Sequence, residues 1–312
     1  MLAFLDQRNA VCPESLLQKA KANPNRARIA VANAGAPLPM ESCKEATDSG
    51  LILPVLVGNR DAILKEAAAL DWDIDTFEIV EAGGEEAAAK AATIAVQEGR
   101  ADVLMKGQLH TDVLMKAALD KETGIRDGRR FVHIFHMTMP ESDRPLLITD
   151  GAVNVTPDLR TRQVAVECVL EVCRAVDIAQ PNVAVLSATE EVIPSVPSAL
   201  AADELVQWAR EAHPEAAFSG PLALDLILSK EPAKIKKRES DPVTGDADAI
   251  IVPDIVAGNV LFKALVYLRA ACAAGVVMGG KVPVVLTSRA DPPAARLASI
   301  ALAAVLKGSG TE

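Results

Sequence analysis

A serine, an arginine and an aspartate lie close together near the C-terminal end of the chain, directly after an apolar run. In the segment Val284–Pro293, Ser288 and Arg289 are followed by Asp291. A guanidinium can bind a phosphate or carboxylate through its planar fork, and a carboxylate can act as a general base. These three residues are therefore candidate catalytic residues acting on an anionic small molecule. Asp291 fits a helix N-cap equally well, because prolines follow it.

A second junction of the same type begins at Val252. Asn259 and Lys263 are four positions apart, so on a helix they share one face near its start. The free N–H groups of a helix start suit an anion. Asn259 and Lys263 are therefore candidate substrate-binding residues, although a helix cap and a solvated lysine fit the same spacing.

Two further apolar runs, Val103–Lys106 and Pro145–Thr149, also end in polar residues. The candidate substrate-binding residues there are Lys106, His110, Thr111, Asp150 and Asn154. Each of them also fits a turn or a helix cap. A basic cluster fits either a solvated loop or contact with the phosphates of a long nucleotide; it comprises Lys234, Lys236, Lys237 and Arg238.

The elements that must position these residues alternate between strands and helices. Strands are predicted at Arg28–Ala32, Pro54–Gly58, Phe77–Glu81 and Val103–Lys106, and helical segments such as Arg60–Leu70 and Glu85–Gln97 lie between them. This alternation predicts parallel strands with right-handed crossovers. Ligands bind outside the carboxyl ends of strands in such sheets, which is where the candidates fall.

The middle of the chain departs from this alternation. Phe131–Met137 and Pro145–Thr149 leave no room for a helix between them, so an antiparallel hairpin is predicted. The elements predicted after it are helix Leu159–Val176, strand Val183–Ser187, helices Ala199–Ala212 and Leu222–Leu228, strand Ala249–Val252, helix Val260–Ala273, strand Val282–Thr287 and helix Ala294–Leu306.

The composition limits the class of protein. The chain has 312 residues, 50% of them hydrophobic and only 3% aromatic, and a formal net charge of −10. That charge argues against general nucleic-acid binding, which needs a basic footprint. The five cysteines are scattered and odd in number, which predicts reduced thiols in the cytoplasm. The first residues lack a signal-peptide pattern and the apolar runs are of strand length, so no membrane association is expected.

Three patterns resemble cofactor- or metal-binding motifs but lack a residue or a geometry that such motifs require. The run Gly275–Val282 approaches a phosphate-binding loop, but Val282 stands where the motif needs a hydroxyl. His133 and His136 are three apart on a predicted strand, so they face opposite sides and cannot share a metal. No GxGxxG follows a strand. We therefore expect neither a metal nor a bound cofactor.

Taken together, the motifs resemble those of the phosphate acetyltransferase/phosphate butyryltransferase family. The residues that carry the resemblance, in chain order, are Leu104–Gly107, Leu147–Asn154, Ser219–Asp225, Val252–Asp254 with Gly258, Asn259 and Lys263, and Ser288–Asp291. The likeness spans nearly the whole chain. It looks closest to the phosphate acetyltransferase part of enoyl-CoA hydratase/phosphate acetyltransferase proteins.

The resemblance implies a two-domain α/β fold, with mostly parallel sheets and flanking helices, like that of isocitrate and isopropylmalate dehydrogenases. Residues 1–139 plus 276–312 would form the first domain and residues 140–275 the second, with the active site in the cleft between them. It also implies a homodimer. The activity implied is reversible acetyl transfer between coenzyme A, a substrate rather than a bound cofactor, and inorganic phosphate.

The resemblance also implies roles for individual residues. Ser288 and Arg289 match the pair that contacts the thiol and the phosphoryl group. Ala295 stands where the family places an aspartate proposed as the base, so Asp291 is the substitute predicted here. The family arginine in the helix after Leu104–Gly107 is also missing, and Lys106 or Lys116 would supply that charge.

Other activities remain open from the sequence. A phosphate butyryl- or propionyltransferase would use the same residues. A metal- and nicotinamide-dependent dehydrogenase of the related fold would need an acidic metal cluster that the sequence does not assemble. A non-catalytic acyl-CoA-binding protein would explain Ala295.

Overall fold

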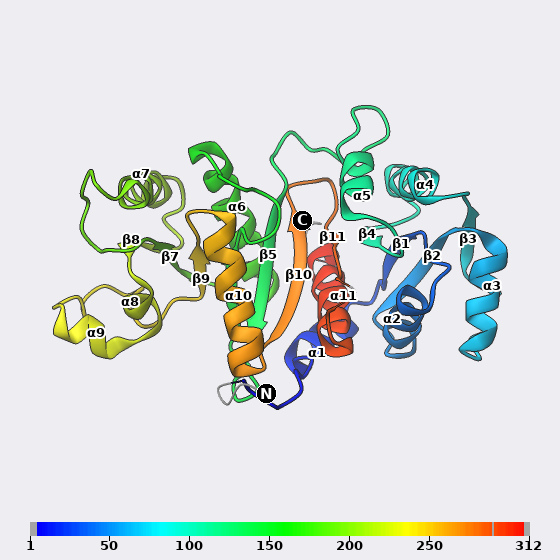
Figure 1. The fold of residues 1–312 in the computed structure, drawn as a ribbon, viewed down its shortest axis with the longest axis horizontal. Helices are drawn as coiled ribbons and strands as arrows, with labels where there is room; N and C mark the ends of the chain where they lie inside the picture. Colours follow the sequence, from blue (N-terminus) through cyan, green and yellow to red (C-terminus); the bar gives the residue numbers. More distant parts are fainter. Residues whose placement is uncertain (1–4, 289, 309–312) are drawn as a thin grey trace. The chain divides into compact units, whose positions relative to one another are not determined.

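A computed structural model describes residues 5–288 and 290–308 of the chain (Figure 1). Contacts divide it into two compact units. The middle unit contains residues 5–9 and Val132–Ala273, and the terminal unit contains Ala10–Phe131 and residues 274–308. Boundaries at 139/140 and 275/276, as expected from sequence, would move strand β5 (Val132–Thr138) into the terminal unit. The first described residues join the middle unit because the Asp6 N–H donates to the Tyr267 carbonyl (3.1 Å) and Arg8 pairs with Glu141 (2.6 Å).

The sheet of the terminal unit follows the predicted alternation. Its strands, in spatial order, are β3 (Glu78–Glu81), β2 (Ile52–Gly58), β1 (Ala27–Ala32), β4 (Val103–Lys106), β11 (Val284–Val285) and β10 (Cys272–Met278). The pairs from β3 to β11 are parallel, and β11 pairs with β10 in the antiparallel sense. Strands β1 and β4 are buried almost throughout, as expected of parallel strands covered on both faces.

Two groups of helices pack around this sheet. Helix α4 (Glu85–Gln97) packs on β1, β2 and β4, and α5 (Thr111–Ala118) packs on α4. Helix α11 (Pro293–Gly308) packs on β1, β4 and β11. Helices α1 (Glu14–Ala22) and α2 (Pro37–Asp48) pack on α11, and α3 (Arg60–Ala69) packs on α2, β2 and β3.

The middle unit contains the predicted hairpin. Strand β5 pairs antiparallel with β6 (Leu146–Thr149), which confirms the prediction. The sheet continues with parallel strands in the order β9 (Ala249–Ile251), β7 (Asn182–Leu186) and β8 (Ala217–Leu222). Its helices are α6 (Leu159–Ala175), α7 (Pro197–Ala212), α8 (Leu224–Leu228), α9 (Lys230–Ile235) and α10 (Ile255–Arg269).

The core of the middle unit joins one sheet face to α8 and α10. Phe135, Ile148 and Ile250 on the strands contact Leu226 of α8 and Leu261 of α10 in one apolar cluster. Burying a side chain of this size stabilises the fold by about 1.5–3 kcal/mol. The core therefore fixes α10, which carries Asn259, against the hairpin that carries Asp150.

Helix α10 differs from the prediction at both ends. It begins at Ile255 rather than Val260, because the Asp254 carboxylate caps it by accepting from the Ala257 N–H (2.9 Å). It ends at Arg269 rather than Ala273, because Ala270 adopts a left-handed conformation (φ 50°). Asn259 is thus inside the helix and is not its cap.

Two strands have no counterpart among the predictions, and one is shorter than predicted. Strand β10 begins within an alanine-rich run that favours a helix by propensity, but the segment is a strand of the sheet, with Val277 opposite Val284 of β11. Strand β8 precedes α8 where only a helix is predicted. Strand β11 covers only Val284–Val285 of the predicted Val282–Thr287.

No helix within the described residues is both long enough and apolar enough to cross a membrane. All five cysteines are free thiols, and burial raises the pKa of Cys12 and Cys43 to about 12.

Candidate active site

Neighbouring strands bring Lys106 beside the turn that contains Ser288. Strands β4 and β11 are parallel, with Leu104 opposite Val284 and Met105 opposite Val285. The carboxyl ends of the two strands therefore lie at the same edge of the sheet. Lys106 is the last residue of β4, and residues 286–288 follow β11. Lys106 is 9% exposed, whereas Ser288 is exposed to solvent. The sequence placed both residues at strand ends, and their proximity follows from this pairing.

The backbone next to Lys106 approaches β1 very closely. The N–H groups of Gly107 and Gln108 donate to the carbonyls of Ala32 and Asn33, each at 2.9 Å. A Cβ on residue 107 would lie 2.6 Å from the Asn33 carbonyl oxygen, so only glycine fits. Gly107 thus holds Lys106 and Gln108 against the end of the neighbouring strand.

Asp291 closes the turn between β11 and α11. Its Oδ2 accepts from the Ser288 N–H (2.7 Å), and the Ser288 carbonyl accepts from the Asp291 N–H (3.1 Å). Helix α11 begins at Pro293, two residues after Asp291. The Asp291 carboxylate therefore stabilises the turn that leads into the helix.

The environment of Asp291 favours its protonated form. Burial raises its pKa, and this outweighs the hydrogen bond from Ser288 and the positive charges of Arg296 and Lys106, which lower it. A carboxylate with a raised pKa is a better proton acceptor than a fully solvated one. Arg289, the third residue of the predicted catalytic group, lies outside the described residues.

Arg296 is not among the residues that the sequence motifs single out. It is only 7% exposed, and its guanidinium donates from Nε to Ser42 Oγ (2.9 Å) and from Nη1 to the Asp291 carbonyl (2.6 Å). The guanidinium therefore ties α11 to α2 and to the Ser288–Asp291 turn. A lone arginine in the first turns of an otherwise apolar helix is the signal that could have identified it.

A small cavity adjoins this group within the terminal unit. Its lining includes Ser42, Lys106, Gln108, Thr287 and Arg296. Two cations thus border one polar cavity at the carboxyl ends of β4 and β11. Such an arrangement can bind a small anion next to the serine and the carboxylate.

His110 and Thr111 take a different position from Lys106. Thr111 is the first residue of α5 and is exposed. The N–H of His110 and its Nδ1 both contact the Glu85 carboxylate, at 2.9 and 2.8 Å, so His110 ties the start of α5 to the start of α4. Among the described residues that line the cavity, neither His110 nor Thr111 appears. Their role in substrate binding stays a prediction.

Asp150 organises the turn after β6. It is 5% exposed, and its two oxygens accept from the N–H groups of His133 (3.0 Å), Ala152 (2.8 Å), Val153 (2.9 Å) and Asn154 (3.3 Å). The Asn154 side chain also donates to Asp150, at 2.7 Å. These bonds match the turn-forming alternative that the sequence left open for Asp150 and Asn154.

Asn259 and Lys263 both lie on α10. Asn259 contacts the turn after β6, and Lys263 lies one helical turn further along. Asn259 Nδ2 donates to the Gly151 carbonyl (3.3 Å), where the helix and the turn make contact through two glycines. A Cβ on Gly258 would lie 2.8 Å from the Gly151 Cα. Lys263 is exposed, with Nζ 5.9 Å from the centre of the Phe262 ring. The structure thus brings Asp150, Asn154 and Asn259 together, with Lys263 one turn further along.

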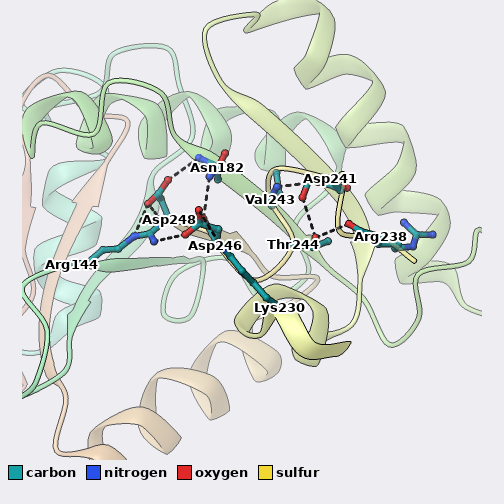
Figure 2. A network of polar contacts seen from close by, with 9 residues as sticks. All are labelled: Arg144, Asn182, Lys230, Arg238, Asp241, Val243, Thr244, Asp246 and Asp248. Atoms are coloured by element: carbon teal, nitrogen blue, oxygen red, sulfur yellow. Dashed lines mark hydrogen bonds and ion pairs between the residues drawn. The ribbon is translucent and has the colours of Figure 1, made fainter. Parts of the chain in front are cut away.

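The basic cluster of Lys234, Lys236, Lys237 and Arg238 spans the end of helix α9 and the residues that follow it. Lys234 pairs with Glu231 (2.8 Å), and Lys236 pairs with Glu190 (3.1 Å) and Asp225 (3.5 Å). Figure 2 shows how the following residues are held: Thr244 donates to the Arg238 carbonyl, and Asp246 and Asp248 bind Arg144. Two of the four cations of the cluster are therefore paired with carboxylates of the protein.

No group of three or more metal-binding side chains occurs within residues 5–288 and 290–308. His133 and His136 are both buried, and burial lowers the pKa of each to about 4.

The fold and the cavity define an α/β protein with a polar cavity, lined by two cations, at the carboxyl ends of parallel strands. Residues 85–304 match the profile of the phosphate acetyl/butaryl transferase family. The chain therefore belongs to this family.

Named relatives and solved structures agree with the family match. The chain is 42% identical to a phosphate acetyltransferase of Rhizobium meliloti, over 84% of this chain and 83% of the relative. It is 36% identical to a phosphate butyryltransferase of Clostridium acetobutylicum, over 90% and 94%. A branched-chain phosphotransacylase from Enterococcus faecalis superposes with a TM-score of 0.78 and 30% identity, over 92% of this chain and all of that chain.

More distant structures share the fold alone. A 4-hydroxythreonine-4-phosphate dehydrogenase from Burkholderia phymatum has a TM-score of 0.53 at 12% identity, over 90% of this chain and 98% of that chain.

Proposed function

We propose that this chain is a phosphate acyltransferase that moves an acetyl group reversibly between coenzyme A and inorganic phosphate. Family membership and relatives named phosphate acetyltransferase support the activity. The observation that carries the proposal for the site is the convergence of Lys106, Ser288 and Asp291 at the ends of β4 and β11, with the Arg296 side chain beside them.

The proposed reaction needs no covalent enzyme intermediate. Asp291, or a water that it orders, takes the proton of the coenzyme A thiol while Ser288 hydrogen-bonds the sulfur. The sulfur then forms a bond to the carbonyl carbon of acetyl phosphate, and the carbon–oxygen bond to the phosphoryl group breaks to release phosphate. Positive charge from Arg289 and Lys106 offsets the repulsion between the two anionic substrates, so that positioning can lower the barrier.

Residues of the middle unit are proposed to contact the same substrates. Asn259 would stabilise the oxyanion of the tetrahedral intermediate, and Lys263 would bind a phosphate of coenzyme A. His110, Thr111, Asp150 and Asn154 complete the proposed substrate-binding set; the saturated hydrogen bonds of Asp150 favour an indirect role, through the turn that supports Asn259.

One assay tests the activity. Purified chain should consume acetyl phosphate only when coenzyme A is present, and acetyl-CoA should accumulate in equal amount. Propionyl and butyryl phosphate should be measured in parallel, because the similarity to the Clostridium acetobutylicum butyryltransferase favours butyryl transfer as the second candidate. Binding of acyl-CoA without any turnover of the three acyl phosphates would overturn the proposal.

Three further properties belong to the same proposal. The fold would be of the isocitrate and isopropylmalate dehydrogenase type, with domains 1–139 plus 276–312 and 140–275. The protein would act as a homodimer in the cytoplasm, without nucleic-acid or membrane partners and with coenzyme A only as a substrate. Sedimentation of the purified chain at several concentrations tests the dimer.

A further inference from the structure

The cavity beside β4 has a positively charged lining. Among the described residues that line it, Lys106 and Arg296 are cationic and none is acidic. Both are more than nine-tenths buried. The Asp291 carboxylate interacts with both charges but is not part of the lining. Two cations in a polar lining attract a negatively charged occupant.

The hydrogen bonds of Arg296 leave one part of its guanidinium available. Nε donates to Ser42 Oγ and Nη1 donates to the Asp291 carbonyl, so two of its three nitrogens are committed to the protein. Nη2 has no hydrogen-bond partner among the described residues, although a guanidinium has five N–H donors in a fixed fork. Because two nitrogens are anchored, the third is held in place before any ligand arrives.

We propose that Arg296 binds the phosphoryl group of the substrate in this cavity, with its Nη2 donating to a phosphate oxygen and Lys106 supplying a second positive charge. This assignment rests on the proposed acyl transfer. It gives Arg296 two tasks: its Nη1 holds the turn that carries Ser288 and Asp291, and its Nη2 binds the anion.

Inorganic phosphate suits this cavity better than the other anionic groups of the substrates do. The cavity is small, and its polar lining comes from Ser42, Gln108 and Thr287 as well as the two cations. A compact tetrahedral anion can accept from a guanidinium, an ammonium and a hydroxyl at once. A pyrophosphate that carries an adenosine needs an open groove.

The test uses the full chain, inorganic phosphate as the probe, and two cavity variants. Arg296→Lys keeps the charge but loses the anchored fork. Gln108→Glu places a carboxylate beside the two cations, where it competes with the anion. Arg60→Lys is the matched control, because Arg60 is an exposed arginine on α3 of the same unit.

The expected result separates phosphate from the other substrate. Arg296→Lys should raise the dissociation constant of phosphate, measured by titration calorimetry without coenzyme A, and the KM for phosphate by about tenfold or more. The KM for acetyl-CoA should change far less, and the control should match the parent chain. Gln108→Glu should abolish phosphate binding while the melting temperature stays equal or rises, which rules out unfolding as the cause.

Two outcomes separate this assignment from the proposed function. Active variants whose phosphate KM and dissociation constant are unchanged would overturn the role of Arg296 and leave the acyltransferase intact. The parent chain could instead bind phosphate, lose that binding in Arg296→Lys, and show no acyl transfer. That result would overturn the proposed function but support the anion site.

Discussion

Two aspartates at the ends of strands, Asp150 in the middle unit and Asp291 in the terminal unit, are used in opposite ways. Asp150 accepts four backbone N–H groups and one side-chain amide, so its oxygens are saturated by the protein. Among the described residues, Asp291 accepts one side-chain hydrogen bond, from the Ser288 N–H, and partial burial raises its pKa. A saturated carboxylate stabilises a turn, whereas a partly buried carboxylate with spare acceptor capacity is available to take a proton.

The same contrast applies to two arginines. Arg144 is exposed and is shared between Asp246 and Asp248 in the network of Figure 2, and Asp248 also accepts from the Asn182 N–H (2.9 Å). Arg296 is buried, forms no ion pair with a carboxylate among the described residues, and borders a cavity. Completed networks therefore mark structural positions in this chain, and incomplete ones mark the candidate site.

The largest effect is expected from removing the proposed base. Asp291→Asn keeps the size of the side chain but cannot accept a proton from a thiol, so kcat should fall about 100- to 10,000-fold. Steady-state rates with acetyl phosphate and coenzyme A measure this effect. A kcat within a few-fold of the parent would show that another group is the base.

Asp150 should show the reverse pattern. Asp150→Asn replaces one acceptor oxygen with an NH₂ group that faces N–H donors, which leaves buried donors unsatisfied. The free energy of unfolding should fall by about 2–4 kcal/mol. Urea denaturation followed by circular dichroism measures the loss. Equal stability of variant and parent would contradict the structural role assigned to Asp150.

Gly258→Ala probes the contact between α10 and the Asp150 turn. The added Cβ would lie 2.8 Å from the Gly151 Cα and 2.9 Å from the Asp150 carbonyl, so helix and turn must separate. The expected loss is about 1–3 kcal/mol of unfolding free energy, with a raised KM because Asn259 moves. Gly128→Ala is not a suitable control, since its φ of 73° is itself strained for alanine; Gly83→Ala, with open space around it, is suitable.

The pH dependence of stability should also report the environment of Asp291. The folded pKa of Asp291 is raised above its unfolded value, so its contribution to stability is fully present at low pH and is lost as the pH rises through the folded pKa. Above that pH the ionised carboxylate destabilises the fold slightly, and Asp291→Asn should melt at a higher temperature than the parent. The gain should vanish in acid; a gain that persists below pH 4 would contradict the assignment.

The fall of kcat/KM at acid pH provides a kinetic test of the Asp291 carboxylate. If Asp291 is the base, kcat/KM should decline at a higher pH than an aspartate of ordinary pKa would require, because burial keeps it protonated longer. The residual kcat/KM of Asp291→Asn should not show this decline at acid pH.

The smallest effect is expected from the basic cluster. Lys236 is paired with Glu190 and Asp225, so its charge is partly used within the protein. Lys236→Ala should change the KM for coenzyme A by no more than about twofold. A much larger increase in the KM for coenzyme A would indicate that the basic cluster contacts the nucleotide part of coenzyme A.

Much of the fold could be predicted from residue patterns. The strands β1 to β4, the β5–β6 hairpin and helices α6 and α11 lie within a few residues of their predicted positions. Their signals are local: apolar runs, turn residues and helical spacing. Strand β10 could not be predicted this way, because its alanine-rich start favours a helix by propensity, whereas the folded segment is a strand of the sheet.

The chain itself determined the types of residue at the strand ends, and hence that Ser288, Asp291 and Lys106 were candidates for work on an anion. Only the tertiary structure decided which aspartate is saturated and which is not, since the N–H donors around Asp150 include one from His133, seventeen residues away. It also decided that Arg296 belongs with Ser42, 254 positions distant. Hydrogen bonds of that kind depend on distances in space, and spacing along a sequence does not contain them.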